Sequence, residues 1–128
     1  MMRRIPYLVL LALFVGACAS SGSPRSLSSR NVITQQEIES VNVSTAYEVV
    51  QQLRPHFLQG RGQTSIQDPG SSMPVVYVNG VRYGSPDVLR GMRSMDLREI
   101  RFLSASDATT RYGTGHVGGV IEVTTRGT

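Results

Sequence analysis

The chain is poor in the residues that build disulfides, metal sites and acid-base centres. Its 128 residues include one Cys, two His and no Trp. One Cys cannot form an internal disulfide, and this inventory is too small for a zinc cluster or a Cys-His pair. We therefore expect no metal, no cofactor and no enzyme activity. A Ser-His-Asp arrangement stays open, because Ser is abundant and spatial neighbours cannot be read from a sequence.

Lysine is absent, so all 13 basic residues are Arg, against 9 Asp and Glu, and the formal net charge is +4. Arg3 and Arg4 fall within the first 17 residues, and the 11 Arg that follow face the same 9 acids, a net charge of +2. So small a charge does not favour nucleic-acid binding.

Long runs of apolar residues are lacking outside the first part of the sequence. Met1 to Tyr7 contains two Arg and no acid, and Leu8 to Val15 is continuously apolar. This is the plan of an export signal. A helix of this length would cover less than half of a hydrocarbon core of about 30 Å, so it is too short to span a membrane.

The segment Val15-Gly16-Ala17-Cys18 resembles the lipobox of bacterial lipoproteins. That resemblance implies that residues 1–17 are a signal peptide removed before Cys18, and that the Cys18 thiol and the new amino terminus are acylated, palmitate being a typical acyl chain. Ala19 follows where an Asp would retain some lipoproteins at the inner membrane, which favours the outer membrane. The alternative is a secreted protein with an incidental Cys. Residues 18–30 are Ser-rich and predict a flexible tether.

Residues 31–128 are enough for one compact core. Val32-Ile33 is a short apolar pair, and Thr34 precedes Glu37 at capping-box spacing, which predicts a brief helix to about Ser40. Thr45 and Glu48 repeat this spacing before a helical apolar pattern. Pro55 should end or kink that second helix at Arg54.

Residues 59–74 lack a sustained period and predict a long loop, either a binding loop or a disordered one. Val75 to Val78 and Val81 to Tyr83 flank Asn79-Gly80, the dipeptide that favours a two-residue turn. A β-hairpin is therefore predicted.

The remaining segments alternate between short helices and strands. Ser85 and Pro86 should open a short helix through Met92, with a capped turn at residues 94–97 and a strand at 99–103. Ser106 or Asp107 should cap a helix through Tyr112 that Gly113 stops in the left-handed conformation. With a strand at residues 119–125, the order predicts an α+β fold, a small mixed sheet with short helices on one face.

Several motifs have a structural interpretation that we favour over a chemical one. Gly113, Gly115 and Gly118 match G-x-G-x-x-G but follow a helix and precede the last strand, which is the wrong context for a dinucleotide site. These glycines instead predict that the backbone turns tightly and approaches a neighbouring element closely. His56 is expected at a helix end and His116 in a solvent-facing loop. Scattered solvated charges and local ion pairs are expected for the Arg set: Arg54, Arg61, Arg82, Arg90, Arg93, Arg98, Arg101 and Arg111.

Residues 75–127 resemble the plug domain of TonB-dependent outer-membrane receptors. The matching segments read V-V-Y-V-N-G-V-R, D-L-R-E-I-R-F-L-S-A-S-D-A-T-T-R-Y-G and G-G-V-I-E-V-T-T-R-G. Tyr112-Gly113 and Gly118-Gly119 with the two residues that follow carry the match most specifically, and the stretch from Ile33 to Pro55 matches more loosely. The resemblance implies a plug-like domain over residues 31–128 and an envelope setting.

The sequence also departs from that family. In the receptors a barrel of about 22 strands follows the plug, whereas the sequence ends at Thr128, and no apolar TonB-box segment is visible between Cys18 and Asn31. The resemblance therefore carries over the fold and the setting but not energy-coupled import.

We expect a non-catalytic outer-membrane lipoprotein that is anchored through Cys18 on the periplasmic face of the membrane. It is expected to act as an interaction module that binds an envelope protein partner and to be associated with transport. The expected surface is the 59–74 loop with the hairpin tip at Asn79-Gly80. Two alternatives stay open. One is direct binding of a small ligand, a siderophore or a glycan, and the other is a small hydrolase using Ser with His56 or His116.

Overall fold

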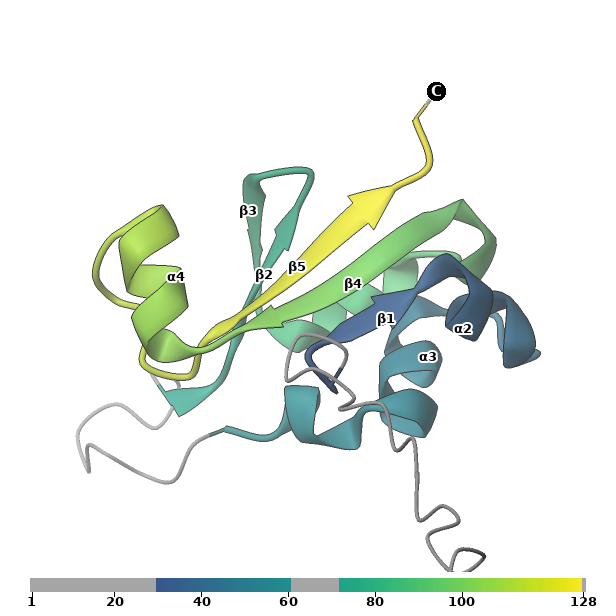
Figure 1. Ribbon diagram of the computed structural model, residues 1–128, viewed down its shortest axis with the longest axis horizontal. Helices are drawn as coiled ribbons and strands as arrows, with labels where there is room; N and C mark the ends of the chain where they lie inside the picture. Colours follow the sequence, from purple (N-terminus) through teal and green to yellow (C-terminus); the bar gives the residue numbers. More distant parts are fainter. Residues whose placement is uncertain (1–29, 61–71, 128) are drawn as a thin grey trace, which may run out of the picture.

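A computed structural model describes residues 30–60 and 72–127. Their centre is a five-stranded sheet with strand order β1-β4-β5-β2-β3 (Figure 1). β2 pairs with β5 in parallel, and the other neighbours pair antiparallel. The α+β fold with a small mixed sheet is thus confirmed. The strands are β1 (Val32–Thr34), β2 (Val75–Val78), β3 (Val81–Gly84), β4 (Leu97–Leu103) and β5 (Val120–Thr125).

Both predicted capping boxes are present. At the start of α2 (Gln35–Ser40), the Thr34 hydroxyl accepts from the Glu37 N–H at 3.4 Å, and the Glu37 carboxylate accepts from the Thr34 N–H at 2.9 Å. Thr45 and Glu48 form the same reciprocal pair at the start of α3 (Ala46–Leu53), at 3.3 and 3.0 Å. Each box satisfies two N–H groups that a helix start leaves without partners.

Among the segments that lie wholly within the described ranges, η1 (Pro55–Leu58), η3 (Pro86–Gly91) and η4 (Ser94–Asp96) are 3₁₀ helices. Pro55 follows the end of α3 as predicted, but the helix expected from Ser85 to Met92 is 3₁₀ and its Ser85 side chain makes no cap bond. The bonds from Val88 N–H to the Ser85 carbonyl and from Met92 N–H to the Leu89 carbonyl span three residues. A segment this short closes more readily with the tighter turn.

The last helix, α4 (Ala105–Tyr112), begins earlier than predicted. Its cap is Ser104, whose hydroxyl accepts from the Asp107 N–H at 3.2 Å, and not Ser106 or Asp107. β4 ends at Leu103, so Ser104 is the first side chain free to cap the chain as it leaves the sheet. Gly113 ends α4 with φ 88° and ψ −172°, a positive φ but not the left-handed helical conformation that was expected.

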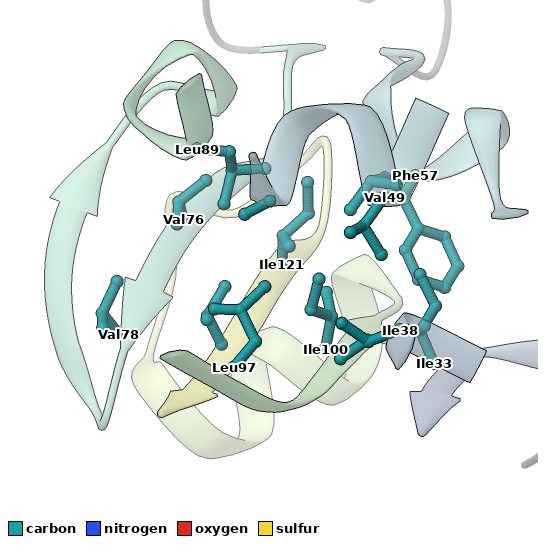
Figure 2. Packing of buried hydrophobic residues seen from close by; sticks show 13 residues of the cluster. Ile33, Ile38, Val49, Phe57, Val76, Val78, Leu89, Leu97, Ile100 and Ile121 are labelled. Atoms are coloured by element: carbon teal, nitrogen blue, oxygen red, sulfur yellow. The ribbon is translucent and has the colours of Figure 1, made fainter. Parts of the chain in front are cut away.

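The main core lies between one face of the sheet and α2, α3, η1 and η3. Figure 2 shows Val49 and Phe57 pointing toward Ile33, Ile100 and Ile121 of the sheet. The Phe57 ring stacks on that of Phe102 at a centroid distance of 5.2 Å. Each large apolar side chain buried in this way contributes about 1.5–3 kcal/mol relative to exposure.

The prediction that all helices cover one face is wrong for α4. Tyr77 lies between Val76 and Val78 on β2, and these two valines belong to the main core, so the Tyr77 side chain points to the opposite face. The Tyr112 ring of α4 stacks on Tyr77 there, at 4.0 Å between centroids. Figure 1 places α4 at one end of the sheet, away from α2 and α3. Within the described ranges, no helix has the length and apolar character needed to cross a membrane.

Candidate functional site

The hairpin of β2 and β3 forms one edge of the sheet, and its turn is held firmly in place. Asn79 and Gly80 have φ of 49° and 84°, the positive values that the predicted two-residue turn requires. The Asn79 N–H donates to the Val123 carbonyl at 2.9 Å. The Asn79 side chain donates to the Thr125 hydroxyl at 2.8 Å and accepts from the Thr125 N–H at 3.0 Å. The exposed tip is therefore tied to β5.

Beyond the tip, β3 is an edge strand whose side chains lie in solvent. We call Val81, Arg82 and Tyr83 the hairpin edge. Val81 is 62% exposed and Tyr83 is 58% exposed, which is unusual for apolar side chains next to a core. Arg82 is also exposed, and in the part of the chain that the structure describes no carboxylate lies within ion-pair distance of it.

A second group of polar and titratable side chains lies on the opposite face of the sheet, against α4. We call Tyr77, Arg111, Tyr112, His116 and Glu122 the α4 cluster. His116 is 7% exposed, which corrects its prediction as a solvent-facing loop residue. Its Nδ1 lies 2.9 Å from the Gly113 carbonyl and its Nε2 lies 3.0 Å from the Tyr77 hydroxyl. A carbonyl can only accept, so Nδ1 carries the proton and the Tyr77 hydroxyl donates to Nε2.

Glu122 binds the two α4 residues of the cluster, Arg111 and Tyr112. Its carboxylate accepts from the Tyr112 hydroxyl at 2.7 Å and pairs with Arg111 at 2.9 Å, and its side chain is 12% exposed. Burial raises the pKa of Tyr112, and the hydrogen bond to Glu122 and that residue's negative charge raise it further, against the smaller lowering by Arg111. The phenol is thus held protonated, as a donor to Glu122.

The α4 cluster does not form a nucleophilic site. Both ring nitrogens of His116 are engaged by Tyr77 and Gly113, and neither partner is a serine. His56 is exposed in η1, where its ring packs edge-on against Phe57. Among the residues described, no three His, Cys, Asp or Glu side chains gather as a metal ion would require. The arrangement rigidifies the end of the sheet rather than activating a serine.

Of the glycines singled out from the sequence, Gly118 and Gly119 lie at points of close backbone approach, whereas a Cβ on Gly113 or Gly115 would meet open space. A Cβ on Gly118 would overlap the backbone of Ser72 and Met73, and a Cβ on Gly119 would lie 2.6 Å from the Leu103 carbonyl oxygen. Gly60 also lies against Ser72, so the two ends of the 59–74 segment meet here. Residues 61–71 of that predicted loop, Arg61 included, lie outside the described residues, and so does Cys18.

The predicted motif residues thus form two groups rather than one. Tyr112, Gly113, Gly118 and Gly119 gather near the start of β5, whereas Asn79 and Gly80 lie beside its end. The roles of Tyr77, Glu122 and the hairpin edge were missed. The apolar residues at alternate positions after the Asn-Gly turn, Val81 and Tyr83, indicated a strand, but its place at the edge of the sheet and their exposure are known only from the structure.

Six of the nine arginines in the described ranges make ion pairs, some with near neighbours as expected and others with distant residues, such as Arg126 with Glu39. Their distances to a carboxylate are 2.9 Å for Arg54 and 2.9 Å for Arg93, with the remaining pairs formed by Arg90, Arg101, Arg111 and Arg126. Arg90 also lies over the Tyr47 ring, 3.7 Å from its centroid. Arg30, Arg82 and Arg98 have no carboxylate within ion-pair distance among the residues that the structure describes.

A groove of about 350 Å³ lies between the end of α2 and η4. Its walls include Ile38, Val43 and Met95, and Met95 is 64% exposed. Arg126 reaches Glu39 at its rim, at 2.6 Å. It is the second surface at which a ligand could be held.

A family model described as "TonB-dependent Receptor Plug Domain" matches residues 24–120 of the chain. The match runs from before β1 to the first residue of β5 and so includes the hairpin, α4 and the glycine turn. No curated protein and no solved structure matches the chain.

Proposed function

Since the chain belongs to the plug-domain family of TonB-dependent receptors, we propose that it is a non-catalytic interaction module of the cell envelope, held at the outer membrane by a lipid anchor at Cys18. Plug domains are non-catalytic parts of outer-membrane receptors, which associates the chain with the envelope and with transport. In this proposal the domain contacts an envelope protein through the hairpin edge.

The observation that carries the proposal is the exposure of the hairpin edge. Val81 and Tyr83 project from β3, an edge strand that pairs with β2 on one side only, and exposed apolar side chains at such an edge favour contact with another protein. The turn beside them is tied to β5 through Asn79, so the surface is presented in one conformation. A preorganised surface loses little conformational entropy on binding.

The non-catalytic part of the proposal is supported by the α4 cluster. A general base needs a ring nitrogen that can take a proton from a nucleophile. Nδ1 of His116 already donates to Gly113, and Nε2 already accepts from Tyr77. The exposed His56 contacts Phe57 and takes part in no comparable network within the described ranges.

Photo-crosslinking in the native envelope tests the surface. We would place p-benzoylphenylalanine at Tyr83 of the full-length chain, and at Met95, which is similarly exposed at 64% but lines the groove instead. A discrete protein adduct from position 83 and none from position 95 is expected. An adduct from position 95 alone would move the interaction surface to the groove, and no adduct from either position would refute an interaction module.

The lipid anchor is tested separately. Cys18→Ser removes the thiol that the lipobox resemblance marks for acylation. We expect the variant to lose palmitate label and to leave the membrane fraction, because a chain without an acyl anchor has no comparable membrane affinity. Full-length Cys18→Ser protein that stays in the outer membrane would contradict the anchor.

Binding of a small ligand, a siderophore or a glycan, is the alternative, and the groove favours it. Its volume of about 350 Å³ lies at the low end of small-molecule sites. Met95→Arg would place a long charged side chain at its mouth. Native mass spectrometry of the full-length chain should detect a retained molecule in the wild type and not in this variant. Equal spectra would dismiss the alternative.

A further inference from the structure

The backbone N–H and C=O groups of Arg82 point away from β2, toward the open edge of the sheet. The N–H groups of Val75 and Asn79 donate to Gly119 and Val123 of the β5 side. Alternate residues of a strand direct these groups to opposite sides, so Tyr77 also faces β5, and Val76 and Val78 face β3. Tyr77 is the register partner of Arg82. Their pair is therefore of the non-hydrogen-bonded kind, and the Arg82 N–H and C=O point outward.

Val81 and Arg82 lie on opposite sides of the sheet around that outward backbone. Val81 is opposite Val78 on the core side, whereas Arg82 is opposite Tyr77 on the other side. The register of β2 and β3 shifts between Val76 and Tyr77, so Tyr83 has no direct partner on β2. The edge thus presents an apolar, cationic, apolar sequence of side chains beside free donor and acceptor groups. A further strand laid along it would bring its own alternating side chains against Val81 and Arg82.

Charge complementarity indicates the chemistry of that strand. Arg54, Arg90, Arg93, Arg101, Arg111 and Arg126 each have a carboxylate partner. Arg82 has none in residues 30–60 and 72–127, although its guanidinium lies beside an open strand edge. A carboxylate directly opposite Arg82 on an added strand would supply that partner.

A second copy of the chain is a poor occupant. The outward groups of Arg82 in two copies can bond each other only when the two β3 strands pair around Arg82. That register sets the two guanidinium groups opposite each other, and like charges directly across a ladder are destabilising. The edge therefore favours a different, acidic strand over self-association.

We propose that the hairpin edge binds an extended segment of a partner protein as a sixth strand, and that this segment carries an acidic residue between two apolar ones. This inference rests on the proposed interaction function and specifies the chemistry of the partner segment. The Arg82 backbone supplies two hydrogen bonds, and the acidic side chain faces the Arg82 guanidinium. The apolar side chains on either side of the acid lie toward the exposed Val81 and Tyr83, which flank Arg82 along the chain.

Two synthetic peptides test the inference by fluorescence anisotropy with the full-length chain. The probes are fluorescein-labelled Ser-Thr-Val-Glu-Val-Thr-Ser and the same peptide with Lys in place of Glu. We expect the wild type to bind the Glu peptide about tenfold more tightly than the Lys peptide, and Arg82→Glu to reverse this preference. Arg98→Glu is the matched control, because Arg98 is exposed on β4 and also has no carboxylate partner among the described residues. It should leave the preference unchanged.

Amide exchange provides a second readout. Binding of the Glu peptide should slow exchange at the Arg82 N–H, while circular dichroism verifies that Arg82→Glu is folded. Equal affinity for both peptides, no binding of either, or a preference that survives Arg82→Glu would each overturn strand addition.

The failure of this inference is distinguishable from failure of the proposed function. An adduct from position 83 in the envelope, together with peptides that bind without charge preference, would leave the interaction module standing and refute strand addition. Charge-dependent peptide binding without an adduct would support strand addition and refute the envelope role.

Discussion

Replacing Gly119 by Ala should destabilise the fold through two separable effects. Gly119 has φ of +85°, a backbone conformation that residues with a Cβ rarely adopt. The added Cβ would also lie 2.6 Å from the Leu103 carbonyl oxygen and 2.8 Å from Cζ of the Phe102 ring. Leu103 is paired with Val120 in the β4–β5 ladder, so its carbonyl cannot retreat without disturbing that register.

The expected cost follows from these two effects. A positive φ costs a residue with a Cβ about 1–2 kcal/mol. Overpacking against atoms that cannot relax costs about 1–3 kcal/mol. Gly119→Ala should therefore lower the free energy of unfolding by about 2–5 kcal/mol, a large part of the stability of a small domain.

Three other glycines separate the contributions. Gly115 has φ of +95° and open space where a Cβ would lie, so Gly115→Ala should show the conformational cost alone, about 1–2 kcal/mol. Gly118 has no positive φ but lies against the backbone of Ser72 and Met73, so Gly118→Ala should show the contact cost, about 1–3 kcal/mol. Gly91 has neither constraint, and Gly91→Ala should stabilise the chain by about 0.4–1 kcal/mol.

Urea unfolding of the full-length variants, followed by far-ultraviolet circular dichroism, measures these differences. The order of stability should be Gly91→Ala, wild type, then Gly115→Ala and Gly118→Ala, and last Gly119→Ala. If Gly119→Ala unfolded at the same urea concentration as Gly91→Ala, the close approach of β5 to β4 inferred at this turn would be refuted.

Two further predictions concern hydrogen bonds. Tyr77→Phe leaves the buried Nε2 of His116 without its donor and should lower the free energy of unfolding in urea by about 1–3 kcal/mol. Tyr83→Phe changes an exposed ring and should leave that free energy unchanged. Equal effects of the two variants would show that the Tyr77–His116 bond does not stabilise the fold. Backbone hydrogen bonds from Thr45 and Ser44 lower the pKa of Glu48 below its ordinary 4.5. The stabilising contribution of Glu48 is therefore complete above pH 4.5, the ordinary pKa of the unfolded chain, and is lost as the pH falls through the lower pKa of the folded chain. The urea midpoint of the wild type should therefore fall more steeply than that of Glu48→Gln between about pH 5 and pH 3, and parallel curves would contradict the capping box.

Features that depend on neighbouring residues could be predicted from the sequence. The capping boxes at Thr34 and Thr45 need a partner three positions away, and the Asn79-Gly80 turn needs only its own dipeptide. The same locality explains the end of α3 before Pro55. In each case the physical cause lies within one turn of chain, so no knowledge of the tertiary fold is needed.

Features that depend on distant residues could not be predicted. His116 was expected in solvent because its partner Tyr77 is 39 positions away along the chain. The placement of α4 on the second face was missed because only Ala108 is buried in that helix, with Tyr112 half-buried beside it. So few apolar residues do not indicate which face of a sheet they will cover.

The candidate site was predicted in part. The exposed tip at Asn79-Gly80 lies where the hairpin pattern placed it, but the sequence did not reveal that Asn79 is bonded to Thr125 or that Arg82 lacks a carboxylate partner among the described residues. Both facts depend on the position of β5, which is more than 40 residues away from Asn79. The charge pattern alone could not distinguish the unpaired Arg82 from its paired neighbours.

The central position of β5 has a consequence for when the domain can fold. β5 separates the β1–β4 pair from the β2–β3 hairpin, and it is the last of these five strands to be synthesised. An isolated two-stranded unit is marginal in water, so we expect each half to be less stable while Val120–Thr125 are still missing. The complete sheet can form only after these residues have left the ribosome. In the export that the proposed lipid anchor requires, this delay would present the translocation machinery with an extended polypeptide rather than a closed sheet.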